Sequence, residues 1–199
     1  MYPKILEDTI NYFKKLPGIG DKSAERMALA LLNYDSQELA DFGNSVINLK
    51  DSLHPCPTCG YLTDLENECA ICLDKSRDEN LICVVEDYKS AFLFEKMGSF
   101  KGKYHVLNKL ISPMNGVNPE DINLHTLIER VKKLNNPEII LALRSTVEGD
   151  ATTLYINKVL DKEKVTVSRL SYGIPMGAEI DYLDVMTLNR AIEDRKQIS

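Results

Sequence analysis

Apolar residues recur at helical spacing through the first 53 positions, in three stretches separated by turn-forming residues. The first stretch ends at the turn sequence LPGIG (16–20), the second begins directly after it, and the third follows Ser36, a predicted N-cap. The apolar positions of the three predicted helices are, in order, Leu6, Ile10 and Phe13; Ala24, Met27, Ala28 and Leu31; and Leu39, Phe42, Val46, Leu49 and Leu53. The pattern predicts a helical region over residues 1–53.

From residue 78 onward, short apolar runs alternate with helical patterns. The runs LICVVE (81–86), YHVL (104–107), EIILAL (138–143) and VTVSRL (165–170) have the length and composition of strands. Helices are predicted over about 89–97, 125–134 and 150–160, and a further one over about 182–195. This alternation is typical of an α/β fold with a mostly parallel sheet covered by helices.

Composition and charge narrow the class of protein. The 199 residues are 44% apolar with a net charge of −6, which is ordinary for a globular protein and argues against one that coats nucleic acid with its whole surface. The longest apolar runs are too short to cross a bilayer and the first residues lack a signal-peptide core, so we expect a cytoplasmic protein. One segment, 96–109, has four lysines and no acidic residue, and is equally compatible with a solvated loop and a binding patch.

Four cysteines form two C-x-x-C pairs between residues 54 and 77, CPTCG and CAIC, separated by nine residues. Two such knuckles can close a tetrahedral shell of four thiolates around one structural Zn²⁺. Paired disulfides and a redox dithiol are the alternatives, and a reducing compartment disfavours the first. The predicted ligands are Cys56, Cys59, Cys69 and Cys72. Cys83, inside a strand-like run, is predicted to be a buried small hydrophobe, and His54, His105 and His125 receive no role.

The turn LPGIGDKSAER combines features of a phosphate-binding hairpin. Gly18 and Gly20 allow a sharp turn and close approach by another molecule, and the helix that follows begins with unpaired N–H groups. Lys22 and Arg26, four residues apart, can neutralise neighbouring phosphates without reading bases. A helix–helix turn also needs glycine for purely structural reasons. The hairpin can serve as a dimer contact as well, and this use is compatible with phosphate binding.

With these parts in order, the chain resembles the RecR family of bacterial recombination mediators from end to end. The motifs that carry the resemblance are LPGIGDKSAERMA, the four-cysteine finger, ICVVED, KYHVLNKLISPMNGVNPEDI, TVEGDATTLY and YGIPMGAEIDYLDVMTLNRAIEDR. The resemblance implies a helix–hairpin–helix domain (1–53), a four-cysteine zinc finger (54–77), a Toprim domain (78–174) and a C-terminal oligomerisation segment (175–199). The residues Lys22, Arg26 and the four cysteines match the family's basic hairpin residues and zinc ligands.

The resemblance also implies a function. Members of the family act without catalysis in DNA repair, working with RecO and RecF to load recombinase onto single-stranded DNA. They assemble as dimers and tetrameric rings, in which the hairpins and the C-terminal segment contact neighbouring subunits. For residues 175–199 of this chain, packing on the same subunit is the alternative to exchange with a neighbour.

The carboxylates of the predicted Toprim domain differ from those of Toprim enzymes. Topoisomerases and primases hold Mg²⁺ with a glutamate after one strand, which Glu86 matches, and with an aspartate pair after a later strand. In RSTVEGD (144–150), Arg144 and Thr146 stand where both aspartates are expected. The missing carboxylates argue against Mg²⁺ binding at this position and favour pairing of Arg144 with a carboxylate. We predict instead that Glu86, Glu148 and Asp150 present negative charge to a basic partner such as RecO or RecF.

Two rival functions remain at this point. A Mg²⁺-dependent Toprim nuclease or topoisomerase-like enzyme would need the missing aspartates, and no recognised motif supplies a strand-cleaving tyrosine or serine. A zinc-stapled scaffold that binds only proteins would not need Lys22 and Arg26. The sequence favours a DNA-binding and partner-binding adaptor.

Overall fold

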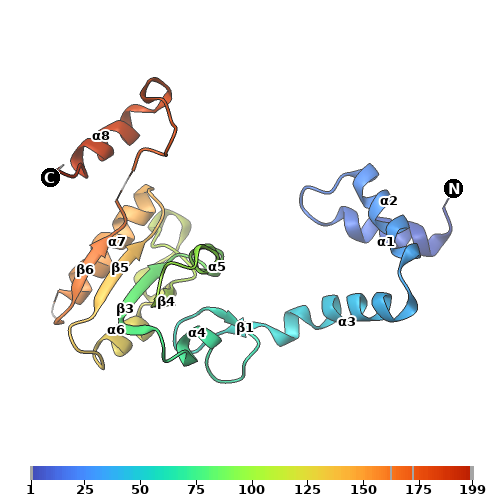
Figure 1. Ribbon diagram of the computed structural model, residues 1–199, viewed down its shortest axis with the longest axis horizontal. Helices are drawn as coiled ribbons and strands as arrows, with labels where there is room; N and C mark the ends of the chain where they lie inside the picture. Colours follow the sequence, from blue (N-terminus) through green and yellow to red (C-terminus); the bar gives the residue numbers. More distant parts are fainter. Residues whose placement is uncertain (1, 162, 172, 198–199) are drawn as a thin grey trace. The chain divides into compact units, whose positions relative to one another are not determined.

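The computed structural model of the protein describes residues 2–161, 163–171 and 173–197 (Figure 1). The chain divides into two compact units, Met1–Leu53 and His54–Ser199, each with its own core. The finer division of the second unit into zinc finger, Toprim domain and C-terminal segment stays a prediction.

The first unit is helical, as the apolar spacing predicts. Helices α1 (Lys4–Lys14) and α2 (Asp21–Ala30) pack against each other, and a 3-10 turn, η1 (Leu31–Asn33), follows. Ile10, Ala24 and Ala28 are buried at the contact, with Leu6, Phe13 and Ile19 packed around them. The two alanines have small side chains, so the helices can approach closely.

The third helix, α3 (Ser36–Ser52), begins one residue earlier than expected. Its N-cap is Asp35 and not Ser36: the Asp35 carboxylate accepts a hydrogen bond from the Glu38 amide at 2.8 Å, and the Glu38 carboxylate accepts one from the Asp35 amide at 3.1 Å. This reciprocal capping box uses the side chain of the last extended residue. The predicted apolar stripe exists, but Leu39, Phe42, Val46 and Leu49 are between 40% and 61% exposed within the described chain.

The second unit is built on a four-stranded parallel sheet, as predicted. Its strands are β3 (Asp78–Val85), β4 (Gly102–Val106), β5 (Glu138–Ala142) and β6 (Thr166–Arg169), in the order β4-β3-β5-β6. In the register of the sheet, Cys83 of β3 lies beside Tyr104 of the edge strand β4 on one side and beside Ile140 of β5 on the other. Parallel neighbours bring the carboxyl ends of β3 and β5, with the residues that follow them, to the same edge of the sheet.

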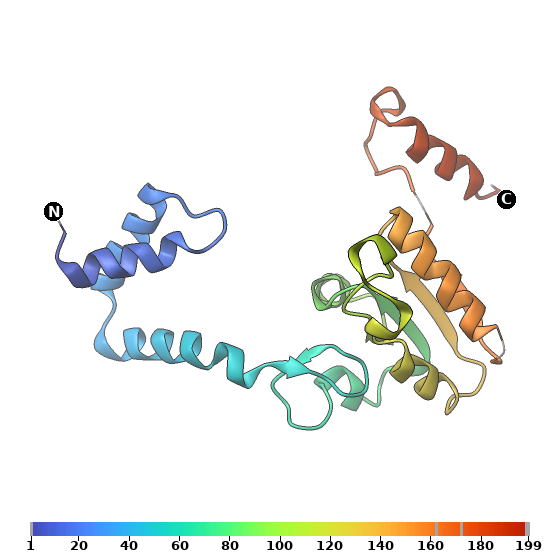
Figure 2. The same ribbon diagram turned by 180° about the vertical axis from the view of Figure 1, so that it is seen from behind.

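Helices cover both faces of this sheet. Ile82 and Val84 of β3 pack with residues of α6 (His125–Val131) and α7 (Val147–Leu160), whereas Cys83 and Val85 pack with residues of α5 (Tyr88–Met97). Figure 2 shows α7 lying across one face. This two-sided burial explains why LICVVE is apolar without alternation, and it confirms Cys83, 1% exposed, as a core residue.

Shorter elements complete the second unit. The cysteine segment has a two-residue antiparallel pair, β1 (His54–Pro55) with β2 (Leu62–Thr63), and a short helix, α4 (Ala70–Leu73). Two 3-10 turns, η2 (Pro113–Asn115) and η3 (Pro119–Asp121), lie in the loop after β4. Near the C-terminus, η4 (Ile180–Tyr182) precedes α8 (Val185–Glu193), which Asp184 caps. No helix in the described part of the chain is long and apolar enough to span a membrane.

Candidate functional site

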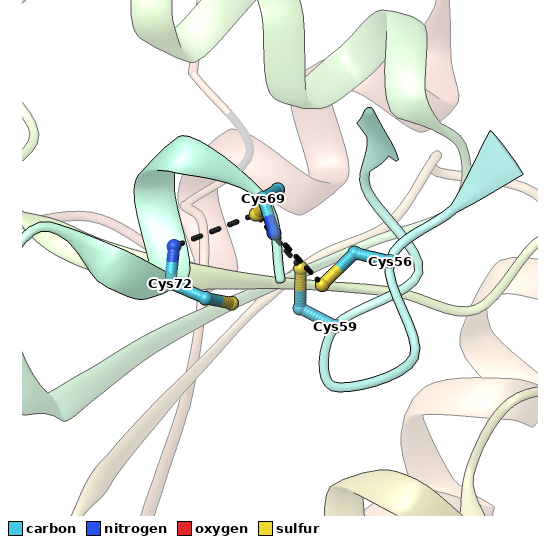
Figure 3. Close-up of side chains that lie close together, drawn as sticks. All are labelled: Cys56, Cys59, Cys69 and Cys72. Carbon is cyan, nitrogen blue, oxygen red and sulfur yellow. Dashed lines mark hydrogen bonds between the residues drawn. The ribbon is translucent and has the colours of Figure 1, made fainter. Parts of the chain in front are cut away.

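The four predicted metal ligands come together in the second unit (Figure 3). The sulfur atoms of Cys56, Cys59, Cys69 and Cys72 all lie within 4.8 Å of one another, and Cys59 Sγ is 3.6 Å from Cys69 Sγ. Sulfurs bound tetrahedrally to Zn²⁺, at about 2.3 Å each, lie about 3.8 Å apart. The donor set therefore fits one metal ion with thiolate ligands, and none of the three histidines belongs to a metal-binding cluster of the described residues.

Local structure turns each pair of sulfurs inward. In the first knuckle, the Gly60 amide donates to Cys56 O at 2.8 Å and Gly60 takes a φ of +73°, a conformation that suits glycine. In the second knuckle, Cys69 caps α4 and its sulfur accepts a hydrogen bond from the Cys72 amide. The Thr58 hydroxyl donates to Glu68 across the two knuckles at 2.5 Å. Backbone turns and hydrogen bonds within each knuckle thus orient the ligands toward one another.

Within the sulfur cluster, Cys69 is the cysteine whose thiolate form is favoured by its neighbours. The hydrogen bond from the Cys59 thiol lowers the pKa of Cys69 and raises the pKa of Cys59 itself. The amide of Cys72 further stabilises the Cys69 thiolate. Cysteines bind a metal ion as thiolates and release their protons on binding.

The lysine-rich segment 96–109 is neither a solvated loop nor a continuous basic patch. It contains strand β4, which is buried along its whole length, and Lys103 is 1% exposed. Its ammonium group donates to the carbonyl oxygens of Ile71, Cys72 and Asp74 at 2.8, 3.1 and 2.6 Å. The sequence alone missed this role, because a lysine among other lysines indicates solvent exposure.

His105, on the same strand, is also buried. Burial lowers the pKa of His105 to about 4, so its imidazole is neutral at neutral pH. Its Nε2 lies 2.5 Å from Asn123 O, whereas its Nδ1 is buried without a partner in the described residues. His105 is a core residue next to the finger and not a metal ligand.

The predicted DNA-binding residues gather at the hairpin between α1 and α2. Gly18 has a φ of +80°, so the turn requires a residue that adopts the left-handed region. Gly20 is the N-cap of α2, and no side chain caps this helix end. A side chain on Gly20 would meet nothing within 4 Å in this chain, so the close approach predicted for it needs another molecule.

Both hairpin cations face solvent. Lys22 and Arg26 are exposed on the side of α2 opposite the buried Ala24 and Ala28. The acidic residue at the start of the helix, Asp21, is paired with Lys14 at 2.5 Å, which offsets its repulsion of an anion. The geometry can accept phosphates; their binding stays a prediction.

At the carboxyl edge of the sheet, Arg144 pairs with Glu86. Glu86 follows β3 and Arg144 follows β5, and the guanidinium contacts both carboxylate oxygens through Nε, at 2.5 Å, and through Nη2. The pairing raises the pKa of Arg144 and satisfies the Glu86 carboxylate with a fixed cation. A cavity of about 370 Å³ adjoins the pair and is lined also by Lys109, Thr146 and Glu148.

The three predicted rim carboxylates do not form one cluster. Glu86 and Glu148 line the cavity, but Asp150 is ion-paired with Arg190 of α8 at 2.6 Å. Arg190 also donates to the Ser145 hydroxyl at 2.6 Å. The Asp150 carboxylate therefore faces the C-terminal segment, a long-range contact that no local pattern reveals.

Two further residues missed by the sequence analysis hold the rim in shape. Gly149 lies so close to the end of β5 that an added Cβ would be 1.9 Å from Arg144 O. The Thr152 hydroxyl, fully buried, donates to Glu148 O at 2.7 Å and accepts the Ile111 amide at 2.9 Å. It thereby ties the loop after β4 to α7. The small residues of TVEGDATT were the available signal for this close packing.

Comparisons with known proteins agree with this architecture. The family model of the Toprim domain matches residues 80–171. The family models named "RecR, helix-hairpin-helix" and "RecR, C-terminal" match residues 6–49 and 173–196. Recombination protein RecR of Natranaerobius thermophilus is 43% identical over 197 residues, which cover 99% of this chain and 98% of that protein. The chain belongs to the RecR family. The similarity to that RecR protein runs across both units, so the hairpin, the four-cysteine cluster and the sheet all lie within the matched length.

Proposed function

We propose that the protein is a non-enzymatic, DNA-binding recombination mediator that acts with RecO and RecF to load recombinase on single-stranded DNA. The observation that carries the proposal is membership of the RecR family over the whole length of the chain. The predicted cytoplasmic location and assembly into homo-oligomeric rings belong to the same proposal.

DNA contact is assigned to the hairpin. Gly18 and Gly20 leave the backbone open, and Lys22 and Arg26 are exposed and in no ion pair among the described residues. These groups recognise phosphates and not base edges, so binding is independent of sequence. Each chain offers only a few such contacts, and useful affinity therefore comes from several subunits acting together on one strand.

The four-cysteine cluster is proposed to hold one structural Zn²⁺. Four thiolates fill a tetrahedral shell and leave no open position for water, so the ion folds the finger and does not catalyse a reaction. The fit of the four sulfurs supports this assignment.

The rim of the sheet is proposed to bind a partner protein and not a catalytic metal. The Arg144 guanidinium takes the Glu86 carboxylate that a Toprim enzyme uses for Mg²⁺, and a fixed positive charge there repels a dication. Of the three rim carboxylates, Glu148 is proposed to bind a basic surface of RecO or RecF. Asp150 could join this contact only after its ion pair with Arg190 breaks.

The test is a loading assay on single-stranded DNA covered by its binding protein, with RecO and RecF present. Added protein should shorten the lag before recombinase filaments form. A chain that leaves the lag unchanged contradicts the proposal.

The rival enzymatic function is tested in parallel. Supercoiled DNA should stay intact with the protein and Mg²⁺ or Mn²⁺. Cleavage that disappears in a Glu86→Gln variant would establish a Toprim nuclease in place of a mediator.

A further inference from the structure

The buried ammonium group of Lys103 lies against the second cysteine knuckle. Its three protons go to three carbonyl oxygens, of Ile71, Cys72 and Asp74, and these carbonyls all belong to α4 or to the residue after it. An ammonium group has three donors, so the hydrogen bonding of Lys103 is complete. The side chain is 1% exposed, and water does not solvate the charge.

This charge has no carboxylate partner among residues 2–161, 163–171 and 173–197. The nearby carboxylates are committed to Arg77, which contacts Glu95 at 2.7 Å and Asp74 at 3.3 Å. A buried charge is strongly destabilising unless an opposite charge lies near it. A dication held by the four thiolates would supply such a charge, because it leaves two net negative charges on a cluster whose member Cys72 accepts a hydrogen bond from Lys103 at its carbonyl oxygen.

Strand β4 holds both knuckles at once. The Val106 amide donates to Cys59 O of the first knuckle at 2.7 Å, and Lys103 binds the carbonyls of the second. The first knuckle approaches β4 closely at Gly60, where an added Cβ would lie 2.8 Å from Val106 O. The edge strand of the sheet is therefore the support on which the two halves of the metal site meet.

We infer that Lys103 is the built-in counter-charge of the four-cysteine metal centre, a positioning residue that fixes the second knuckle and raises the affinity of the centre for its dication. This inference rests on the proposed zinc site. It makes the finger and the Toprim sheet one cooperative structure, in which metal binding stabilises β4 and β4 stabilises the bound metal.

The experiment compares the full-length variants Lys103→Met and Lys103→Arg with wild type. Lys103→Met keeps an unbranched side chain that is one heavy atom shorter, and removes the charge together with its three hydrogen bonds, whereas Lys103→Arg keeps the charge. Lys101→Met, at an exposed lysine two residues earlier, is the matched control, and Cys72→Ser removes a ligand. Zinc affinity is measured by competition with a chromophoric chelator, and bound metal by elemental analysis.

Loss of an outer-shell partner typically weakens metal affinity by about 10- to 100-fold, and we expect a loss of this size in Lys103→Met. Cys72→Ser, which lacks a ligand, should lose at least as much affinity. Lys103→Arg and Lys101→Met should stay close to wild type. With zinc removed by chelation, Lys103→Met should lower the melting temperature less than it does with zinc bound, because removal of the buried charge then partly offsets the loss of the three hydrogen bonds. A merely structural lysine would lower the melting temperature with and without zinc alike.

The outcomes separate the two proposals. A wild-type chain without stoichiometric metal would end the zinc assignment and this inference with it. A wild type that binds zinc, next to a Lys103→Met variant of equal affinity, would end this inference alone. If Lys103→Met does not fold, Lys103→Gln and Lys103→Arg are compared, and equal zinc affinity of these two would overturn the role of the charge.

Discussion

Thr152 is predicted to hold the loop of the sheet rim through a single buried hydrogen bond. A Thr152→Val substitution keeps the shape of the side chain and removes its oxygen, so the Ile111 amide loses the acceptor that lies 2.9 Å away. Thr152 is fully buried and Ile111 is 7% exposed, and water cannot readily replace the lost partner. An unsatisfied buried donor costs about 1–3 kcal/mol.

From the middle of this range, the free energy of unfolding should fall by about 2 kcal/mol, which lowers Tm by about 4–8 °C for a unit of this size. Urea unfolding followed by circular dichroism, at one saturating zinc concentration, measures the loss. Hydrogen exchange at the Ile111 amide should accelerate. The matched control is Thr153→Val on the same helix, where the threonine is partly exposed and its hydroxyl makes none of the described hydrogen bonds.

The comparison of Thr152→Val with Thr153→Val shows whether the Thr152 hydroxyl holds the loop. If Thr152→Val and Thr153→Val unfold at the same urea concentration, and Ile111 exchanges as in wild type, the hydroxyl does not tie the loop to α7. The cavity beside Glu86 would then not depend on this contact.

Two further predictions concern backbone packing and pH. Gly149→Ala should disrupt the start of α7, because its Cβ would collide with Arg144 O at 1.9 Å. It should lower Tm by more than Ala151→Gly, a control at an exposed position of the same helix. Equal losses of Tm in the two variants would contradict the close approach of Gly149 to Arg144. Burial lowers the pKa of His105 to about 4. As pH falls, the unfolded chain therefore binds a proton at His105 at a higher pH than the folded chain does. The contribution of neutral His105 to the free energy of unfolding is fully present above about pH 6.5 and is lost as pH falls toward 4. Between pH 7 and pH 5 this group should remove about 2 kcal/mol of stability, and a His105→Gln variant that loses as much as wild type over this range would rule the cause out.

Much of the fold follows from residue patterns that act locally. The spacing of Leu6, Ile10 and Phe13 places α1, and the uninterrupted apolar runs place strands that are buried on both faces. The spacing of the two C-x-x-C pairs predicts the four-sulfur cluster, because backbone turns within each knuckle orient the sulfurs. The substitution of Arg144 for an expected aspartate likewise predicts its pairing with a carboxylate.

Contacts between distant residues could not be predicted in the same way. The pair of Asp150 with Arg190 joins positions 40 apart, and the burial of Lys103 depends on how α4 packs on β4. For Asp150, Arg190 and Lys103 alike, the local sequence indicates a charged side chain exposed to solvent. The choice of Asp35 over Ser36 as the cap of α3 shows a smaller limit, since both residue types are good N-caps and only the backbone conformation distinguishes them.

The hairpin of this RecR-family protein is proposed to bind the phosphates of single-stranded DNA without reading bases. The most direct measurement is the salt dependence of binding to a labelled oligonucleotide by fluorescence anisotropy. It compares wild type, Lys22→Ala with Arg26→Ala, and a control of equal charge change, Lys158→Ala with Lys164→Ala, two exposed lysines of the second unit. We expect weaker binding of the hairpin variant on every sequence, with a slope of log K against log salt that is flatter by about 0.7 for each lost contact. An unchanged slope, or an equal change in the control, would contradict this proposal.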